Sequence, residues 1–227
     1  MRGVGRYLAG MALALVAIVL AGCSNETYES GDGKYSYLQA HYVEARTNHE
    51  GRFVSVVTDE GKALRLRPFL SPRRAVTPDS VYRALFYHNK VEADGTTEPV
   101  SITQVPIVRL RKVGKGESVA TDPVSFESAW VSPNGKYLNI AFGLKTGKVD
   151  DENTVQTIGL LLGKAVTALD GSAELYIQFS HEQNDVPQYY TAHHVISMPL
   201  EGFRGTIHLS VNSYKGLVNK VLTVSSL

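Results

Sequence analysis

WVSPNGKYLNIAF, residues 130–142, carries the clearest β-hairpin signal in this 227-residue chain. Its Ser132-Pro133-Asn134-Gly135 segment supplies the residue types that favour a tight turn between two strands. Beyond the turn, Leu138, Ile140 and Phe142 occupy alternate positions, so they would lie together on one face of a strand. The stretch therefore predicts a pair of strands with one face turned toward an apolar core.

Strands of the same kind continue to the end of the chain. Ahead of the hairpin, Val124, Phe126 and Trp130 are expected to share one face. Seven such strands in roughly 105 residues, without the cysteine pair of antibody domains, predict a β-sandwich of immunoglobulin-like size over residues 119–227. The expected strands lie at residues 124–130, 137–142, 158–162, 174–180, 189–198, 206–211 and 218–224.

The first half of the chain predicts a second, smaller β domain. Leu64-Arg65-Leu66-Arg67 alternates strictly, which places the leucines on one face of a strand and the arginines on the other. Five strands in roughly 80 residues fit a small Greek-key barrel of the OB type over residues 35–115. Gly114 to Ser118 is expected to link the two domains. The five barrel strands are expected at residues 35–46, 52–58, 64–67, 81–92 and 102–113.

The charge balance supports two domains and gives no bulk attraction for nucleic acid. Residues 24–118 carry 14 basic and 12 acidic residues, whereas residues 119–227 carry 7 basic and 10 acidic ones. Nine of the ten arginines beyond residue 22 lie in the first of these segments. Without Arg2 and Arg6 the chain has 21 basic and 22 acidic residues, a net charge of −1. We therefore expect no nucleic-acid partner.

The N-terminus has the features of an export signal. Arg2 and Arg6 precede an apolar run, Leu8 to Leu20, of about 13 residues. A membrane-spanning helix needs about 20 apolar residues, so an uncleaved anchor helix is disfavoured. Residues 1–22 are therefore predicted to be a cleaved signal peptide.

Leu20-Ala21-Gly22-Cys23, at the end of that run, resembles the bacterial lipobox. The resemblance implies cleavage between Gly22 and Cys23, diacylglycerol on Cys23, and acylation of the new amine, for example with palmitate. Cys23 is the only cysteine, so no disulfide competes for it. The alternative is an ordinary signal peptide followed by an unrelated cysteine. We expect residues 23–34 to form a lipidated flexible tether, with Ser24 favouring the outer membrane of the cell envelope.

Three segments of the chain resemble the NigD-like lipoproteins of the Bacteroides and Prevotella group. They are the lipobox at residues 20–23, WVSPNGKYLNIAFGLKTG at residues 130–147, and Leu175 to His181. Within the second segment, Tyr137 to Gly143 matches the family phrase Tyr-Leu-Asn-Ile-x-Phe-Gly. The resemblance implies an N-terminal OB domain and a C-terminal β-sandwich, as the strand count also does. The family name comes from a bacteriocin operon, which implies a role in immunity.

Four arginines at alternate positions form the candidate ligand face. Arg65 and Arg67 lie on one expected barrel strand, and Arg109 and Arg111 lie on another. OB barrels bind ligands on such a sheet face. We expect a sugar, a peptide or an anionic glycan to bind there, and the alternative is a solvated face.

No arrangement for catalysis or metal binding stands out in the sequence. His193-His194 is the most tempting metal pair, but adjacent strand residues point to opposite faces, and a third ligand beside His208 is missing. Gly159 to Lys164 partly resembles a phosphate-binding loop, yet Ala165 stands where Ser or Thr is required. Asp150 to Glu152 is predicted to be a solvated loop. We therefore predict no catalytic residues, no metal and no cofactor.

Taken together, these features predict a non-catalytic, lipid-anchored envelope protein. It would be held at the membrane by the lipid on Cys23 and would act by binding an envelope protein or a glycan. Bacteriocin immunity is the version implied by the family resemblance. The alternatives are a glycan-binding accessory lipoprotein, a structural component of an envelope assembly, and a carbohydrate-active hydrolase. A hydrolase would require a pair of carboxylates in a cleft, and no pair is favoured by the sequence.

Overall fold

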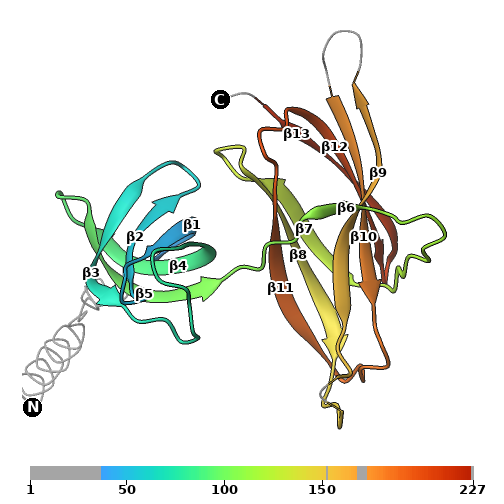
Figure 1. Cartoon of the computed structure of the whole chain (residues 1–227), viewed down its shortest axis with the longest axis horizontal. Helices are drawn as coiled ribbons and strands as arrows, with labels where there is room; N and C mark the ends of the chain where they lie inside the picture. Colours follow the sequence, from blue (N-terminus) through green and yellow to red (C-terminus); the bar gives the residue numbers. More distant parts are fainter. Residues whose placement is uncertain (1–36, 152, 168–172, 226–227) are drawn as a thin grey trace, which may run out of the picture. The chain divides into compact units, whose positions relative to one another are not determined.

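The computed structural model describes residues 37–151, 153–167 and 173–225, and all regular elements in these ranges are β-strands (Figure 1). Within the described residues, no helix is long and apolar enough to cross a membrane. The strands are β1 (Gln39–Thr47), β2 (Phe53–Thr58), β3 (Ala63–Leu70), β4 (Val81–Val91), β5 (Thr96–Gln104), β6 (Leu110–Lys112), β7 (Ser125–Val131), β8 (Tyr137–Thr146), β9 (Thr157–Thr167), β10 (Ala173–Glu182), β11 (Tyr190–Pro199), β12 (Gly205–Ser213) and β13 (Gly216–Val224).

Strands β1 to β5 form a closed barrel in the order β1-β2-β3-β5-β4 (Figure 1). Every pair is antiparallel except β3 and β5, which run parallel. Leu64 and Leu66 of β3 and Ala84 and Phe86 of β4 point inward and are buried. The predicted alternation of β3, and the predicted small barrel, are therefore confirmed. The buried core of the barrel consists of Val43, Ala45, Phe53, Val56, Leu64, Leu66, Ala84 and Phe86.

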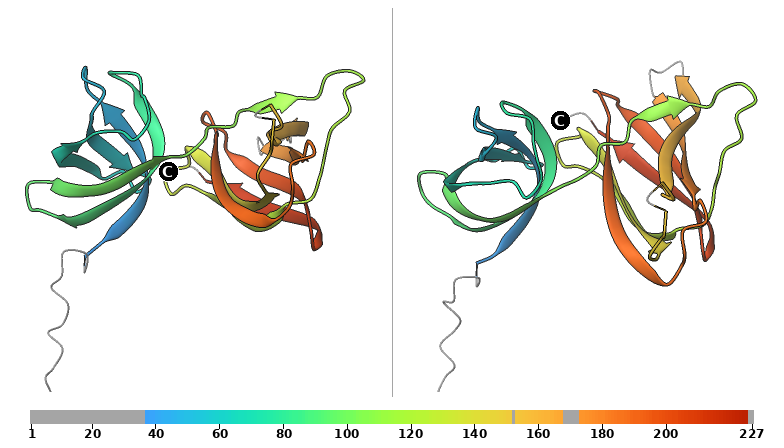
Figure 2. Two further views of the ribbon diagram at one scale, coloured as in Figure 1. Left: turned by 90° about the horizontal axis from the view of Figure 1, so that it is seen from below. Right: turned by 60° about the horizontal axis from the view of Figure 1, so that its bottom comes forward.

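The remaining strands form a β-sandwich, as predicted. One sheet has the order β13-β12-β10-β9-β6 and the other β11-β8-β7. Figure 2 shows the two sheets facing each other, and one hydrophobic core fills the space between them. Leu138, Ile140 and Phe142 of β8 lie in this core with no exposed surface, which confirms the alternation expected after the hairpin. Two strand pairs, β10 with β12 and β6 with β9, are parallel.

The last barrel strand lies earlier in the chain than predicted. The expected strand at residues 102–113 does not exist as one element, because β5 ends at Gln104 and β6 pairs with β9 of the sandwich. The segment expected to link the domains, residues 114–118, follows β6 and so lies within the sandwich. Residues 96–101, which contain Pro99 and many polar residues, form most of β5 instead. The passage from barrel to sandwich therefore falls at residues 105–109.

A β-bulge changes the faces of β7. The register between β7 and β8 shifts between Phe126 and Ser128, which adds one residue on β7. Beyond the bulge, Ala129 joins the sandwich core, and Trp130 packs beside Tyr42 of the barrel with ring centroids 5.5 Å apart. The prediction that Trp130 shares a face with Val124 and Phe126 is therefore wrong. Residues 1–22 and 23–34, including the predicted cleavage site at Gly22 and lipidation site at Cys23, lie outside the described residues.

Candidate functional site

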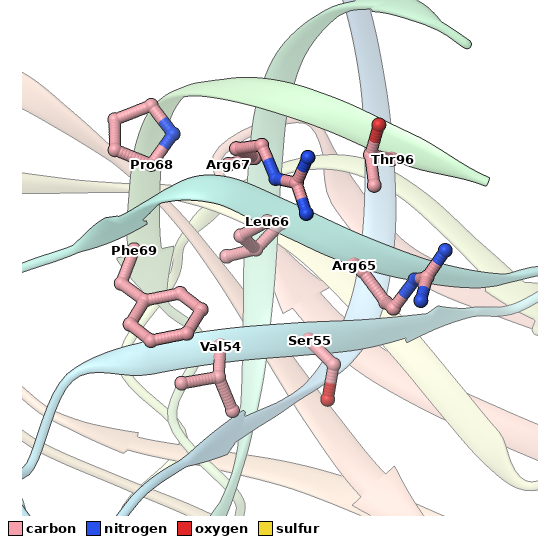
Figure 3. A pocket seen from close by; sticks show the side chains of 8 residues that line it. All are labelled: Val54, Ser55, Arg65, Leu66, Arg67, Pro68, Phe69 and Thr96. Atoms are coloured by element: carbon pink, nitrogen blue, oxygen red, sulfur yellow. The ribbon is translucent and has the colours of Figure 1, made fainter. Parts of the chain in front are cut away.

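A hollow of about 680 Å³ lies on the wall of the barrel against β2 and β3 (Figure 3). The strict alternation of β3 builds it: Leu64 and Leu66 fill the barrel core, which leaves Arg65 and Arg67 on the outside. Ser55 of β2 pairs with Arg65, and Thr96 of β5 pairs with Arg65 on its other side. The lining residues are Val54, Ser55, Arg65, Leu66, Arg67, Pro68, Phe69 and Thr96.

The two arginines of this hollow are only partly paired within the protein. The side chain of Arg65 is 67% exposed and donates one hydrogen bond of 2.7 Å to the backbone carbonyl of Asp94. Its Nη2 also lies 3.8 Å from a carboxylate oxygen of Asp94, at ion-pair distance. Among the described residues, Arg67 has no hydrogen-bond or ion-pair partner. Hydrogen bonds from the Thr96 side chain and amide, helped by the charges of Arg65 and Arg67, hold the pKa of the Asp94 carboxyl below its usual range. The hollow therefore carries positive charge, which the nearby carboxylate of Asp94 neutralises only in part.

Phe69 adds an aromatic surface to the two arginines. Its side chain is 48% exposed although it is large and apolar. The guanidinium carbon of Arg52 lies 5.5 Å from the centre of its ring, within the range of a cation–π contact. A guanidinium group presents a planar fork of donors that matches carboxylate, sulfate and phosphate groups. Arginine beside an exposed ring can therefore bind a ligand that has both an anionic group and an apolar face.

Arg109 and Arg111, the other half of the predicted ligand face, lie elsewhere. Both belong to the segment that enters the sandwich, because β6 pairs with β9 and not with the barrel. Arg109 forms a 2.6 Å ion pair with Glu201, and Arg111 binds Glu117 through two hydrogen bonds of 2.6 and 3.0 Å. The hydrogen bonds from Arg111 and the Gly114 amide lower the pKa of Glu117 to about 2. The four arginines do not form one face, and only Arg65 and Arg67 line the barrel hollow.

A buried polar network around Arg83 was missed by sequence reasoning. The side chain of Arg83, on β4, is only 1% exposed, and that of Asp59 is 6% exposed. The two form a bidentate pair, with Nη1–Oδ1 and Nη2–Oδ2 distances of 2.5 and 2.7 Å. Arg83 also donates to Ser197 at 3.2 Å and to Asn139 at 3.1 Å, and both of these residues belong to the sandwich.

Aromatic and acidic residues complete the same junction. The guanidinium carbon of Arg83 lies 4.3 Å from the ring centre of Tyr137, on β8. Tyr137 and Lys136 both donate to Glu44 of β1, at 2.9 and 2.8 Å. Burial opposes ionisation of Glu44, but these two hydrogen bonds outweigh it and lower its pKa. Barrel and sandwich are thus joined by polar groups that are almost fully paired.

The junction explains the polar positions of the Tyr-Leu-Asn-Ile phrase. Leu138 and Ile140 face the sandwich core, whereas Tyr137 and Asn139 face the other way and contact Arg83. In the sequence, only Asn139 pointed to this network, because a side-chain amide within an apolar strand requires a hydrogen-bond partner when it is buried. No sequence pattern indicates that this partner is Arg83, which lies 56 positions earlier.

The remaining candidates from the sequence do not come together. His193 lies 2.5 Å from Glu127, His194 packs beside Phe142, and His208 belongs to the other sheet. No three or more metal-ligating side chains gather anywhere in the described residues. Residues 159–164 form part of strand β9 and not a phosphate-binding loop. In the acidic loop, Asp151 accepts hydrogen bonds from Asn153, and residue 152 lies outside the described residues.

Several solved structures resemble this chain. A NigD-like immunity protein from Bacteroides caccae is 18% identical, with a TM-score of 0.62 over 81% of this chain and 90% of that one. A protein from Parabacteroides distasonis, provisionally named toxin-related, is 18% identical, with a TM-score of 0.62 over 83% and 94% of the two chains. A Bacteroides fragilis protein provisionally named a lipoprotein is 14% identical, with a TM-score of 0.54 over 83% and 98%. At these identities the likeness shows a shared fold.

The family is shown by the sequence of the sandwich. No curated protein matches the chain. Residues 106–224, however, match the family model described as the NigD-like C-terminal beta sandwich domain. Because this match covers more than half of the 227 residues, the chain belongs to the NigD-like family.

Proposed function

We propose that this protein is a non-catalytic, lipid-anchored envelope protein whose barrel binds an acidic glycan. The observation that carries the proposal is the hollow beside β3, where Arg67 presents an unpaired guanidinium and Arg65 an exposed, partly paired one next to the exposed ring of Phe69. Arginine pairs with the carboxylate or sulfate groups of an acidic sugar, and an aromatic ring packs against the apolar face of a sugar ring. OB barrels bind oligosaccharides on the face of their second and third strands, where this hollow lies.

The lining of the hollow supports binding in preference to hydrolysis. A glycosidase places two carboxylates across the scissile bond. The eight lining residues include no carboxylate and no histidine, so the hollow offers no general acid or base. Its two charged residues are arginines, whose guanidinium groups donate hydrogen bonds and can hold an anion.

The anchoring part of the proposal rests on the lipobox at residues 20–23. The Bacteroides fragilis neighbour, provisionally named a lipoprotein, adds support. We place the lipid on Cys23 and the protein at the outer membrane. Cys23→Ala should move the protein from the detergent phase to the aqueous phase on phase partitioning of whole cells. Retention of the variant in the detergent phase would contradict lipid anchoring, and recovery of the wild type with inner-membrane vesicles would contradict the outer-membrane placement.

Binding is tested by calorimetric titration of the mature protein with hexagalacturonate, a carboxylated hexasaccharide. Replacing both Arg65 and Arg67 by alanine should weaken binding at least tenfold, because two charge-assisted hydrogen-bonding groups are lost. Replacing both Arg109 and Arg111 by alanine is the matched control, since these arginines already pair with Glu201 and Glu117. Absence of wild-type binding, or equal weakening by the two double variants, would contradict the proposed site.

Immunity against a bacterial toxin is the second candidate function. Two structural neighbours favour it by name, the Bacteroides caccae immunity protein and the Parabacteroides distasonis protein provisionally named toxin-related. In this version the protein would bind a toxin at the envelope. Deleting the gene should enlarge the zones of growth inhibition produced by bacteriocins of the same genus. Zones of unchanged size against all tested producers would contradict an immunity role.

A further inference from the structure

A second hollow, of about 350 Å³, lies on the sandwich. It is formed by three neighbouring strands of the five-stranded sheet, β10, β12 and β13, with one residue from β9. The side chains of Tyr176, Gln178, His208 and Ser210 alternate with the buried residues of their strands, so they lie on the outer face of the sheet. The lining residues are Gly163, Tyr176, Ile177, Gln178, His208, Leu209, Ser210, Asn219, Lys220 and Val221.

Strand register arranges this lining in two rows. In the first row Tyr176 pairs with His208, and His208 pairs with Val221. The rings of Tyr176 and His208 are stacked, with centroids 4.3 Å apart and planes 8° from parallel. In the second row, two residues later on β10 and β12 and two earlier on β13, Gln178 pairs with Ser210 and Ser210 with Asn219. One side of the hollow is therefore aromatic and apolar, and the other consists of amides and a hydroxyl.

Most hydrogen-bonding groups of the second row are free of protein partners. Among the described residues, neither the hydroxyl of Ser210 nor the amide of Asn219 has a hydrogen-bond partner. Gln178 donates from its amide nitrogen to the Phe179 carbonyl, which leaves its side-chain oxygen as an acceptor. Nε2 of His208 is shielded from solvent and has no hydrogen-bond partner, although it lies 3.7 Å from a carboxylate oxygen of Glu174. The unpartnered hydroxyl and amides can therefore exchange hydrogen bonds with an occupant.

The charged groups around the hollow are engaged with one another. Glu174 accepts a 2.7 Å hydrogen bond from the hydroxyl of Tyr176, and the ammonium of Lys164 lies 4.1 Å from the centre of the same ring. Lys220 is the charged residue of the lining, and it alternates on β13 with Asn219 and Val221, so its side chain extends to the other face. The groups that face an occupant are thus uncharged, in contrast to the arginines of the barrel hollow.

We propose that this hollow is a separate binding site for a neutral saccharide unit. Amide and hydroxyl groups of Gln178, Ser210 and Asn219 would exchange hydrogen bonds with sugar hydroxyls, which both donate and accept. Tyr176 and Val221 would pack against the apolar C–H groups of the sugar ring. The site does not include the arginines at β3, so the proposal for the sandwich can be tested separately from the function proposed for the barrel.

The test is an NMR titration of the mature protein with four neutral hexasaccharides: cellohexaose, maltohexaose, mannohexaose and xylohexaose. At about 10 mM, above a millimolar dissociation constant, at least one should shift the aromatic signals of His208 and Tyr176. Replacing both Gln178 and Asn219 by alanine should weaken that binding about tenfold, because two amide groups are lost. Thr223→Ala, exposed on the same face of β13 but outside the lining, is the matched control and should leave binding unchanged.

Three results would overturn the proposal. One is that none of the four saccharides shifts the signals of His208 and Tyr176. Another is that the saccharide binds the Gln178 and Asn219 double variant as tightly as it binds the wild type. The third is that replacing Arg65 and Arg67 by alanine abolishes the binding, because the saccharide would then occupy the barrel hollow. Hexagalacturonate serves as the acidic comparison and should leave the His208 signals in place.

Discussion

Arg83 and Arg67 are both strand residues of the barrel, yet they use the same guanidinium group in opposite ways. Arg83 commits four hydrogen bonds to Asp59, Asn139 and Ser197, and its side chain is 1% exposed. Arg67 makes no hydrogen bond within the described residues and borders a hollow of about 680 Å³. An arginine has five donors, and what they bind decides its role. Paired and buried, Arg83 joins two domains; unpaired and exposed, Arg67 is available to a ligand.

The largest effect should follow from breaking the buried pair. Asp59→Ala leaves the charge of Arg83 buried without its carboxylate, which should lower the free energy of unfolding by about 3–5 kcal/mol. Urea denaturation at pH 7 measures this change. Arg67→Ala, as the exposed counterpart, should change it by no more than about 0.5 kcal/mol.

A double variant keeps this prediction testable if the Asp59→Ala chain fails to fold. Replacing Asp59 by alanine and Arg83 by leucine removes the charge together with its partner. It should be more stable than Asp59→Ala alone, because no uncompensated charge is left in the interior. A double variant as unstable as the single one would show that the loss comes from packing and not from the unpaired arginine.

The next largest effect should come from salt, which should weaken the interactions of the exposed arginines more than those of the buried Arg83. Raising sodium chloride from about 50 to 500 mM shortens the screening length severalfold and should weaken hexagalacturonate binding at the barrel hollow by about tenfold. The Asp59–Arg83 pair is buried, so the stability lost in Asp59→Ala should change little over the same range. Titrations and denaturation curves at the two salt concentrations measure both. Binding that does not depend on salt would contradict recognition by Arg65 and Arg67.

Removing the aromatic ring of the hollow should have a smaller effect. Phe69→Ala deletes an exposed ring while leaving both arginines in place. It should weaken hexagalacturonate binding about threefold, because a contact with an exposed ring contributes roughly 0.5–1 kcal/mol to the binding free energy. Stability should stay within about 0.5 kcal/mol of the wild type, because the ring is 48% exposed. Unchanged affinity would remove Phe69 from the site while leaving the arginines as its anion-binding groups.

The last effect concerns the alkaline pH range. Burial and the hydrogen bond to Glu44 raise the pKa of Tyr137 from 10.0 to about 12. The folded state therefore favours the protonated phenol, and this contribution is present below pH 10 and is lost as the pH rises to 12. After allowance for solvent screening it amounts to about 1 kcal/mol. Tyr137→Phe should lose less stability between pH 10 and 12 than the wild type in denaturation curves, and an equal loss would contradict this account.

Alternation along single strands could be predicted from the sequence, and pairing between distant segments could not. Leu64 with Leu66, and Leu138 with Ile140, lie in their cores as expected because a strand has a period of two. The faces of β7 were beyond prediction, since one extra residue at the bulge after Phe126 reverses them. The membership of β6 was also beyond prediction, because its three residues join the sheet by parallel pairing with β9, which lies about 50 positions later in the chain.

At the candidate site, too, strand alternation could be predicted from the sequence and the partners from distant segments could not. Arg65 and Arg67 could be predicted as an exposed pair on one strand, and the structure adds the hollow beside them. Arg109 and Arg111 share that alternating pattern and are also exposed, but their charges are paired with Glu201 and Glu117. The pattern of a strand says which side chains point outward, whereas the partners that neutralise them come from tertiary structure.

The central claim is that the arginines at β3 bind an anion while Arg83 serves the fold. Two-dimensional NMR of the arginine Nε–H groups tests it in a single titration of the mature protein with hexagalacturonate. The account predicts that the signals of Arg65 and Arg67 shift with the added glycan, and that the signal of Arg83 stays in place and exchanges slowly with solvent. Signals of Arg65 and Arg67 that stay in place, or a shift at Arg83, would contradict it.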